Sequence, residues 1–302
     1  MTVARARWLS LLRLDYDVAD MVSRRKFLQL SAASLPLLTR PMWAKTHIPL
    51  GLQLYTLRTL YPGHMEEILR EVRAIGYEQI ELPGDMPATY PAAKLRGMIQ
   101  ESGLIAPGGH FDYTTFEDDF SYAKELNLQW MVISAIPDTM WDSLDGFRRA
   151  ARQFNEWGKR LRDMGMRFAF HTHDYEFRPL EGTTGFETIV KETDPELVSF
   201  EIDCYWVTQA GHDPVRLLNQ LGRRVRLLHL KDRKRGFPPS TSMAVKDFHF
   251  TEVGSGSINW PEIFATAQKL GVEHYYVEQD QTDGPPLASV RKSYDYLRTV
   301  VS

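Results

Sequence analysis

The chain has 302 residues, of which 43% are hydrophobic and 25% charged, a composition typical of a globular enzyme and not of a disordered chain. The net charge of −3 leaves no broad basic field for binding a polyanion, so nucleic acid is not expected as a partner. Cys204 is the only cysteine, which excludes an intrachain disulfide.

The first predicted element is an export signal at residues 1–44. Arg24 and Arg25 are followed by Phe27, a modestly apolar run over 28–38 and then Ala44, an order that resembles a twin-arginine signal peptide. The apolar run is about half the length that a membrane-spanning helix needs, so no stable membrane anchor is expected. We expect cleavage after Ala44, with Met21 as an alternative translation start, and a periplasmic or otherwise exported protein. A basic amphipathic helix is the alternative interpretation.

Residues 45–302 alternate short apolar runs with amphipathic stretches, as a parallel sheet covered by helices does. Four of the predicted helices end at a glycine, namely Gly76, Gly103, Gly165 and Gly271. Eight strands are predicted, at 50–54, 79–82, 105–109, 130–135, 167–171, 198–203, 225–230 and 274–278.

Eight strand–helix units favour a single-domain (β/α)8 TIM barrel of the α/β class. No linker interrupts the units, and no Gly-x-Gly-x-x-Gly turn follows the first strand, as a dinucleotide-binding sheet would require. In such a barrel the catalytic side chains lie at the carboxyl ends of the strands. The last polar residues of each strand are therefore the candidates for a site.

Polar residues gather at the ends of the last three predicted strands, which read Glu201-Ile202-Asp203, His229-Leu230-Lys231 and Glu278-Gln279-Asp280. Carboxylates and imidazoles that converge in a barrel mouth repel one another or lose hydration unless a cation lies between them. Asp203, His229 and Glu278 are therefore predicted to bind one divalent metal ion. The mixed nitrogen and oxygen set favours Mn²⁺ or Zn²⁺, with Mg²⁺, Co²⁺ and Fe²⁺ as alternatives.

The third and fifth strands also end in polar residues, including His110, His171 and His173. His110 is predicted to bind substrate, with a hydrogen-bonded core histidine as the alternative. Trp206 follows the sixth strand closely and is the aromatic residue that we expect to contact the ligand.

The loop Gly254-Ser255-Gly256-Ser257 follows the seventh strand, where barrels often bind phosphate. The alternative, which we favour, is a flexible turn before a helix that begins near Asn259. Asp232 and Asp280 are interpreted as residues that cap or hold loops.

Several segments resemble the sugar phosphate isomerase/epimerase family of xylose isomerase-like barrels. They are FHTHDYEF at 170–177, FEIDCYW at 200–206, LHLKD at 228–232, VGSG at 253–256 and VEQD at 277–280. The resemblance implies one Mn²⁺-like ion held by a carboxylate from the fifth strand together with Asp203, His229 and Glu278.

The fourth ligand is where this chain departs from the family pattern. Members usually carry a glutamate at the end of the fifth strand, whereas this chain has His171 there and Glu176 five residues later. We assign Glu176 as the ligand and His171 and His173 to acid/base chemistry or substrate binding; the alternative exchanges these roles.

The resemblance implies an isomerase or epimerase that acts on a sugar or keto-sugar through an enediolate. His173 or Glu278 is the expected base, and Lys231 is expected to bind substrate and stabilise the oxyanion. Loss of a β-substituent from the same intermediate would make the protein a lyase or hydratase on 3-keto-glycosides, which is the alternative function. A non-catalytic periplasmic sugar-binding protein and a phosphodiesterase relative are more distant alternatives. The sequence does not specify the sugar or the oligomeric state.

Overall fold

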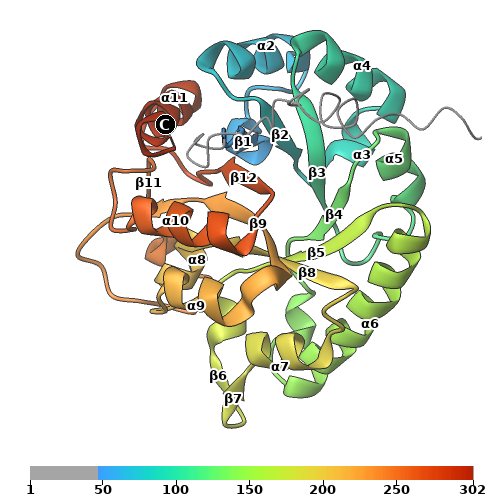
Figure 1. Cartoon of the computed structure of the whole chain (residues 1–302), viewed down its shortest axis with the longest axis vertical. Coiled ribbons are helices and arrows are strands. Elements are labelled where there is room, and N and C mark those ends of the chain that lie inside the picture. The colour runs from blue at the N-terminus through green and yellow to red at the C-terminus, as the bar shows by residue number, and fades with distance from the viewer. Residues whose placement is uncertain (1–46, 302) are drawn as a thin grey trace, which may run out of the picture. The chain divides into compact units, whose positions relative to one another are not determined.

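Eight parallel strands close into a barrel in a computed structural model that describes residues 47–301 (Figure 1). The strand order is β1-β12-β9-β8-β5-β4-β3-β2. The strands are β1 (Leu50–Gln53), β2 (Gln79–Leu82), β3 (Ile105–Phe111), β4 (Trp130–Ile133), β5 (Arg167–His171), β8 (Val198–Asp203), β9 (Val225–Leu230) and β12 (His274–Val277). The predicted TIM barrel and all eight strands are confirmed. The predicted export signal lies outside the described residues.

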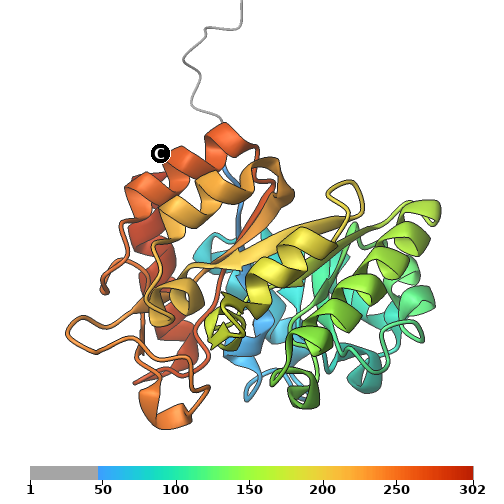
Figure 2. The same ribbon diagram turned by 90° about the horizontal axis from the view of Figure 1, so that it is seen from below.

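Helices surround the barrel on its outside (Figures 1 and 2). They are α2 (Met65–Ile75), α3 (Met86–Thr89), α4 (Ala92–Ser102), α5 (Phe120–Glu125), α6 (Leu144–Asp163), α7 (Gly185–Glu192), α8 (Cys204–Gln209), α9 (Pro214–Leu221), α10 (Trp260–Leu270) and α11 (Pro286–Val300). Within residues 47–301, no helix combines the length and apolar character that crossing a membrane would require.

Local sequence explains where these helices begin and end. The Ser143 hydroxyl accepts a hydrogen bond from the Gly146 amide at 3.1 Å, which caps the amino end of α6. Gly103 and Gly271 end α4 and α10 with φ values of 75° and 78°, a left-handed conformation that glycine adopts without steric cost. The pattern of glycines thus marked genuine helix ends.

The barrel interior contains an apolar layer formed by Trp130, Val132, Ala169, Leu227 and Tyr276. Side chains two residues apart on a strand share a face, so the next inward positions along β5, β9 and β12 hold a different set of residues. These residues are His171, His229 and Glu278. The apolar layer is therefore the floor on which a polar layer stands, nearer to the carboxyl ends of the strands.

Two small antiparallel pairs extend from the loops. β6 (Pro179–Leu180) pairs with β7 (Thr183–Thr184), and β10 (Asp232–Arg233) pairs with β11 (Phe250–Thr251). Cys204 begins α8 and is fully buried.

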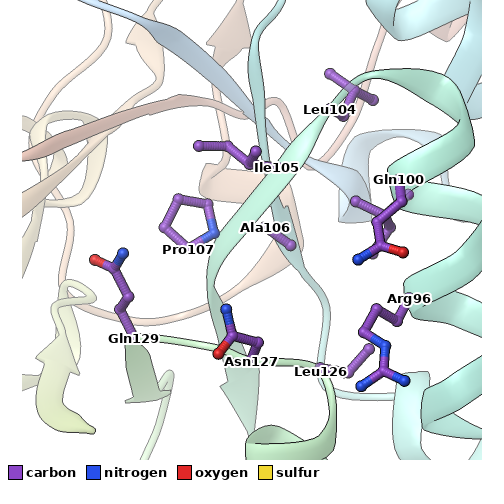
Figure 3. Close-up of a pocket in the computed structure, with 10 residues that line it drawn as sticks. Arg96, Gln100, Leu104, Ile105, Ala106, Pro107, Leu126, Asn127 and Gln129 are labelled. Carbon is purple, nitrogen blue, oxygen red and sulfur yellow. The ribbon is translucent and has the colours of Figure 1, made fainter. Parts of the chain in front are cut away.

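A surface hollow of about 230 Å³ lies between α4 and the first residues of β3 (Figure 3). Ile105 and Gln129, which line it, stand at or just before the amino ends of β3 and β4. It is therefore at the opposite end of the strands from the predicted site.

Candidate active site

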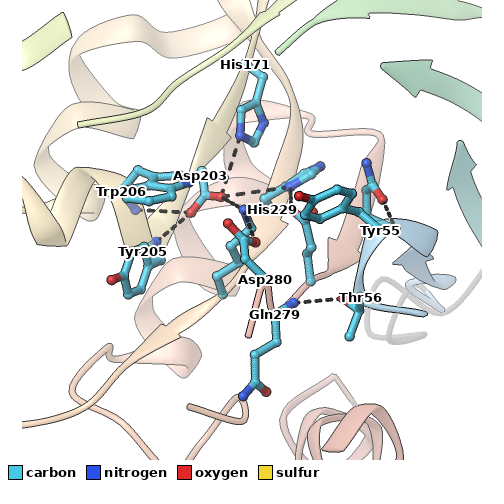
Figure 4. A network of polar contacts seen from close by, with 12 residues as sticks. Tyr55, Thr56, His171, Asp203, Tyr205, Trp206, His229, Gln279 and Asp280 are labelled. Carbon is cyan, nitrogen blue, oxygen red and sulfur yellow. Dashed lines mark hydrogen bonds and ion pairs between the residues drawn. The ribbon is translucent and has the colours of Figure 1, made fainter. Parts of the chain in front are cut away.

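Three predicted metal ligands, Asp203, His229 and Glu278, converge at the carboxyl ends of β8, β9 and β12, with their ligand atoms all within 4.8 Å of one another. Figure 4 shows Asp203 and His229 in this cluster. His229 Nδ1 lies 2.9 Å from Glu278 Oε2 and 3.9 Å from Asp203 Oδ2. Asp203 Oδ1 accepts hydrogen bonds from the amides of Tyr205 and Trp206, which begin α8. These bonds leave Asp203 Oδ2 directed at the centre of the cluster.

His171 brings a fourth candidate ligand atom close to Asp203, although its own group of potential ligands is the one formed with His110, Glu201 and His229. Its Nε2 lies 3.7 Å from Asp203 Oδ2, on the side that β5 contributes (Figure 4). Its Nδ1 lies 2.9 Å from Glu201 Oε2, and an ionised carboxylate only accepts hydrogen bonds, so Nδ1 carries the proton and Nε2 is free to bind a cation. His171 thus occupies the place that the family pattern gives to a glutamate.

Glu176 lies elsewhere. It belongs to a 3-10 turn after β5 (Tyr175–Phe177), is fully buried, and accepts a hydrogen bond from the His173 amide at 2.9 Å. It is in neither group of potential metal ligands among the described residues. Its assignment as a ligand stays a prediction, and the geometry favours the alternative in which His171 takes this role.

Two further buried carboxylates, those of Glu81 and Glu201, form a second layer. They orient His229 and His171 by contacting the ring nitrogen that faces away from Asp203. Glu81 on β2 has its Oε2 2.7 Å from His229 Nε2, and Glu201 Oε2 lies 3.2 Å from the same nitrogen. His110 joins this layer, with its Nε2 2.8 Å from Glu201 Oε2. Carboxylates that hold the far nitrogen of a ligand imidazole fix its orientation and raise its basicity. The two layers therefore form one connected network.

The residues present fit a divalent cation. Glu81, Glu201, Asp203 and Glu278 are buried carboxyl groups, and Lys231 is the only amine that faces them among the described residues. Such an excess of buried acidic groups is costly unless protons or a cation offset it. Two imidazole nitrogens and two carboxylate oxygens are a donor set suited to Mn²⁺ or Zn²⁺.

The pKa values show how protons on the cluster can offset this charge. Burial would lower the pKa of His229, but Glu201 and Glu81 outweigh it and hold that pKa well above the usual value. Burial raises the pKa of Asp203 to about 6, against the opposing effect of Lys231. His171 differs, because burial and the neighbouring His229 keep its pKa well below the usual value. His229 therefore carries a proton on Nδ1 that a bound cation would displace.

Lys231 bridges the cluster to the mouth of the barrel. Its Nζ lies 2.7 Å from Glu278 Oε2, 2.9 Å from Asp280 Oδ1 and 3.1 Å from Asp203 Oδ2. Burial opposes its charge, but these carboxylates outweigh burial and hold the pKa of Lys231 well above the usual value. Lys231 is thus a fixed cation beside the candidate metal centre.

A cavity of about 300 Å³ opens next to these residues, at the small end of the range for small-molecule sites. Its lining includes five of the residues predicted to act on substrate, namely His110, His171, His173, Lys231 and Glu278. His173 has a buried Nδ1 without a hydrogen-bond partner among the described residues, and burial together with Lys231 lowers its pKa to about 3. His173 is therefore a neutral side chain at the cavity wall.

Trp206 is 1% exposed and does not line this cavity. Its ring packs against His173 at a centroid distance of 5.1 Å, so its position is behind the wall. Direct contact with substrate stays a prediction for Trp206. The aromatic residue that lines the cavity is Tyr55, which is 40% exposed.

Sequence reasoning missed Glu81, Gln53 and Tyr55, and it left Glu201 without a role. Two signals could have revealed the missed residues. Glu81 is a charged residue within the apolar strand β2, and polar residues stand at the end of β1. The Asp280 carboxylate, which was expected to cap or hold a loop, instead contacts Lys231 at 2.9 Å in the site.

Comparison with known proteins identifies relatives over most of the barrel. The chain is 33% identical over 225 residues to an inosose dehydratase of Mesomycoplasma hyopneumoniae, which covers 67% of this chain and 74% of that protein. A crystal structure of a sugar phosphate isomerase/epimerase from Parabacteroides distasonis superposes with a TM-score of 0.70 at 25% identity, covering 86% of this chain and 97% of the other. The 3-keto-D-glucoside 4-epimerase of E. coli shares the fold, with a TM-score of 0.62 at 16% identity over 84% of this chain and 100% of the other.

A family model described as xylose isomerase-like TIM barrel matches residues 69–300. This range includes every candidate metal ligand and most of the residues that line the cavity. The chain belongs to the xylose isomerase-like TIM barrel family.

Proposed function

We propose that the protein is a metal-dependent lyase that removes water from a keto-sugar or cyclic keto-polyol. The observation that carries the proposal is the position of His171, whose Nδ1 lies 2.9 Å from Glu201 Oε2 and whose Nε2 lies 3.7 Å from Asp203 Oδ2, where it would bind a metal ion. The inosose dehydratases among the relatives support the same reaction class. This choice reverses the order expected from the sequence, which placed isomerisation or epimerisation first.

His171 bears on the choice because epimerisation removes a proton from one face of a carbon and returns one to the other. A carboxylate on each side of the substrate could do both tasks. Here Glu278 supplies a carboxylate from β12, while β5 supplies an imidazole whose Nδ1 faces Glu201 and whose Nε2 would bind the metal ion. Proton removal on one side followed by loss of a hydroxyl needs no second carboxylate.

Asp203, His229, Glu278 and His171 would hold the divalent ion, which would supply the Lewis acidity that makes the proton beside the ketone easier to remove. His173 is neutral and lines the cavity, so its ring is placed to accept that proton. The C–H electron pair becomes a C=C bond as the β-hydroxyl leaves. His173 then gives this proton to the departing oxygen, which leaves as water, while Lys231 donates a hydrogen bond to the same oxygen.

The test is incubation of the metal-loaded protein with inosose in D2O. Elimination predicts a conjugated enone, seen by its ultraviolet absorbance, and loss of one water by mass spectrometry. Epimerisation or isomerisation would instead give a product that contains deuterium and has lost no water. Asp203→Asn serves as the control that lacks the metal centre.

A further inference from the structure

The loop after β9 forms a concavity of backbone N–H groups that the chain fills with its own carboxylate. Asp232 Oδ2 accepts from the amides of Gly254 and Gly256 at 2.9 and 3.1 Å and from Trp260 Nε1 at 2.9 Å. Asp232 Oδ1 accepts from the amide of Ile258 at 3.2 Å. The Asp232 side chain is 1% exposed, so this arrangement is closed to solvent.

The loop is shaped around that carboxylate. A Cβ atom on Gly256 would lie 2.2 Å from Asp232 Oδ1, and Gly254 has φ +88°, which side chains rarely adopt. Concavities of successive N–H groups bind anions, and in many barrels the loop after the seventh strand and the following helix hold the phosphate of the substrate. Here the anion is Asp232, and no N–H of this set is left for a phosphate. The alternative of a phosphate loop raised by the sequence therefore has no open site.

The side chains that line the cavity offer no free cation for a phosphate among the described residues. Lys231 is the only lysine or arginine among the described residues that line it, and three carboxylates already surround its ammonium group. Arg58 lies near the mouth, but its guanidinium donates to the carbonyl oxygens of Tyr55 and Asp280 and stacks 4.1 Å from the Tyr55 ring. Glu278 and Asp280 would repel a phosphate dianion and would accept hydrogen bonds from hydroxyl groups.

We propose that the substrate is an uncharged, polyhydroxylated ketone that carries no phosphate group. This proposal rests on the proposed function, which gives the reaction, and it adds that the substrate carries no charge. Hydroxyl groups donate to Glu278, Asp280 and Gln53 on the cavity wall, which is rich in acceptors. The structural neighbours named for sugar phosphates would differ from this chain in that respect.

The first experiment measures binding without turnover. Inorganic phosphate and glucose 6-phosphate are titrated into the full-length metal-loaded protein and followed by ³¹P linewidth and calorimetry. No saturable binding at millimolar concentration is expected for the wild type. Asp232→Gly, which empties the concavity, is expected to gain phosphate binding if it folds, as judged by its thermal unfolding. Saturable phosphate binding by the wild type, displaced by inosose, would overturn the proposal.

The second experiment measures turnover of a matched pair, an uncharged ketose and its phosphate ester. The phosphate ester is expected to have a kcat/KM at least about 100-fold lower, because it places an uncompensated dianion beside buried carboxylates. An equal or higher value for the ester contradicts the proposal. If neither compound, nor inosose, reacts, the proposed function fails, while the phosphate titration still decides whether the site accepts the charge.

Discussion

His229 Nε2 lies 2.7 Å from Glu81 Oε2, and both side chains are completely buried in the barrel. Because Glu81 holds the far nitrogen, Nδ1 is left directed at Asp203 and Glu278. Glu81 on β2, which does not line the cavity, thus determines which nitrogen of a ligand from β9 faces the candidate metal centre.

Glu81→Gln is expected to weaken metal binding by about 10-fold, since an amide holds the imidazole less strongly than a carboxylate does. Competition with a chromogenic chelator measures the affinity. Glu78→Gln is the matched control, because Glu78 precedes β2 and pairs with the exposed His47. Equal affinities of the two variants would show that Glu81 has no part in orienting His229.

The identity of the fourth ligand follows from a pair of variants. His171→Ala is expected to lose the tightly bound divalent ion, as Asp203→Ala and His229→Ala are, because His171 Nε2 lies 3.7 Å from Asp203 Oδ2 and is the ligand that we assign from β5. Glu176→Gln is expected to retain the ion. Elemental analysis of the purified proteins measures both. The reverse outcome would restore the original assignment of Glu176 as ligand.

Metal binding is expected to release protons at neutral pH. His229 has a raised pKa and is protonated on Nδ1, so a cation that binds this nitrogen displaces the proton. Calorimetry in two buffers of different ionisation enthalpy gives the number of protons released. Affinity should therefore rise with pH, and a pH-independent affinity would contradict the assignment of His229 as a ligand.

His173→Gln and Lys231→Met separate chemistry from metal binding. Each is expected to lower kcat by about 100-fold or more, since His173 accepts the proton and Lys231 assists the leaving hydroxyl. Deuterium exchange at the carbon beside the ketone should disappear in His173→Gln and persist in Lys231→Met. Exchange that survives in His173→Gln would assign the base to another group, with Glu278 first. Retained metal in both variants is the control.

Glu176 predicts a pH dependence of stability. Burial raises its pKa to about 8 from 4.5, so the folded protein holds a proton on Glu176 that the unfolded chain loses. The stabilisation is complete below pH 4.5 and is lost as the pH rises towards 8, by about 1.4 kcal/mol for each pH unit in that window. Glu176→Gln should therefore exceed the wild type in thermal stability at pH 8 and not at pH 4.5. An equal difference at both pH values would contradict the raised pKa.

The sequence predicted those site residues whose position follows from the end of a single strand. Asp203, His229 and Glu278 could be found because parallel strands in a barrel present their carboxyl ends at one mouth. The apolar runs located all eight strands, four of them with both ends correct and four with an error of one or two residues at the carboxyl end.

The sequence could not predict parts of the site that depend on the path of a loop or on depth in the barrel. Glu176 matched the expected residue type, but the 3-10 turn after β5 carries it away from the cluster. Glu81 stands within a short apolar strand that pairs with β1 and β3, and only closure of the barrel brings it to 2.7 Å from His229 on β9. Trp206 follows Asp203 closely in sequence, yet the turn into α8 buries its ring.

The burial of Cys204 makes this protein a suitable background for labelling at a chosen position. Its thiol is fully enclosed, and burial holds the pKa of Cys204 well above the usual value, so maleimide reagents have no native thiolate to attack. Since the chain has no other cysteine, one introduced at the surface becomes the sole reactive thiol. Tyr55→Cys would place a fluorophore at the cavity mouth, where its emission reports ligand entry without any mutation to remove native cysteines.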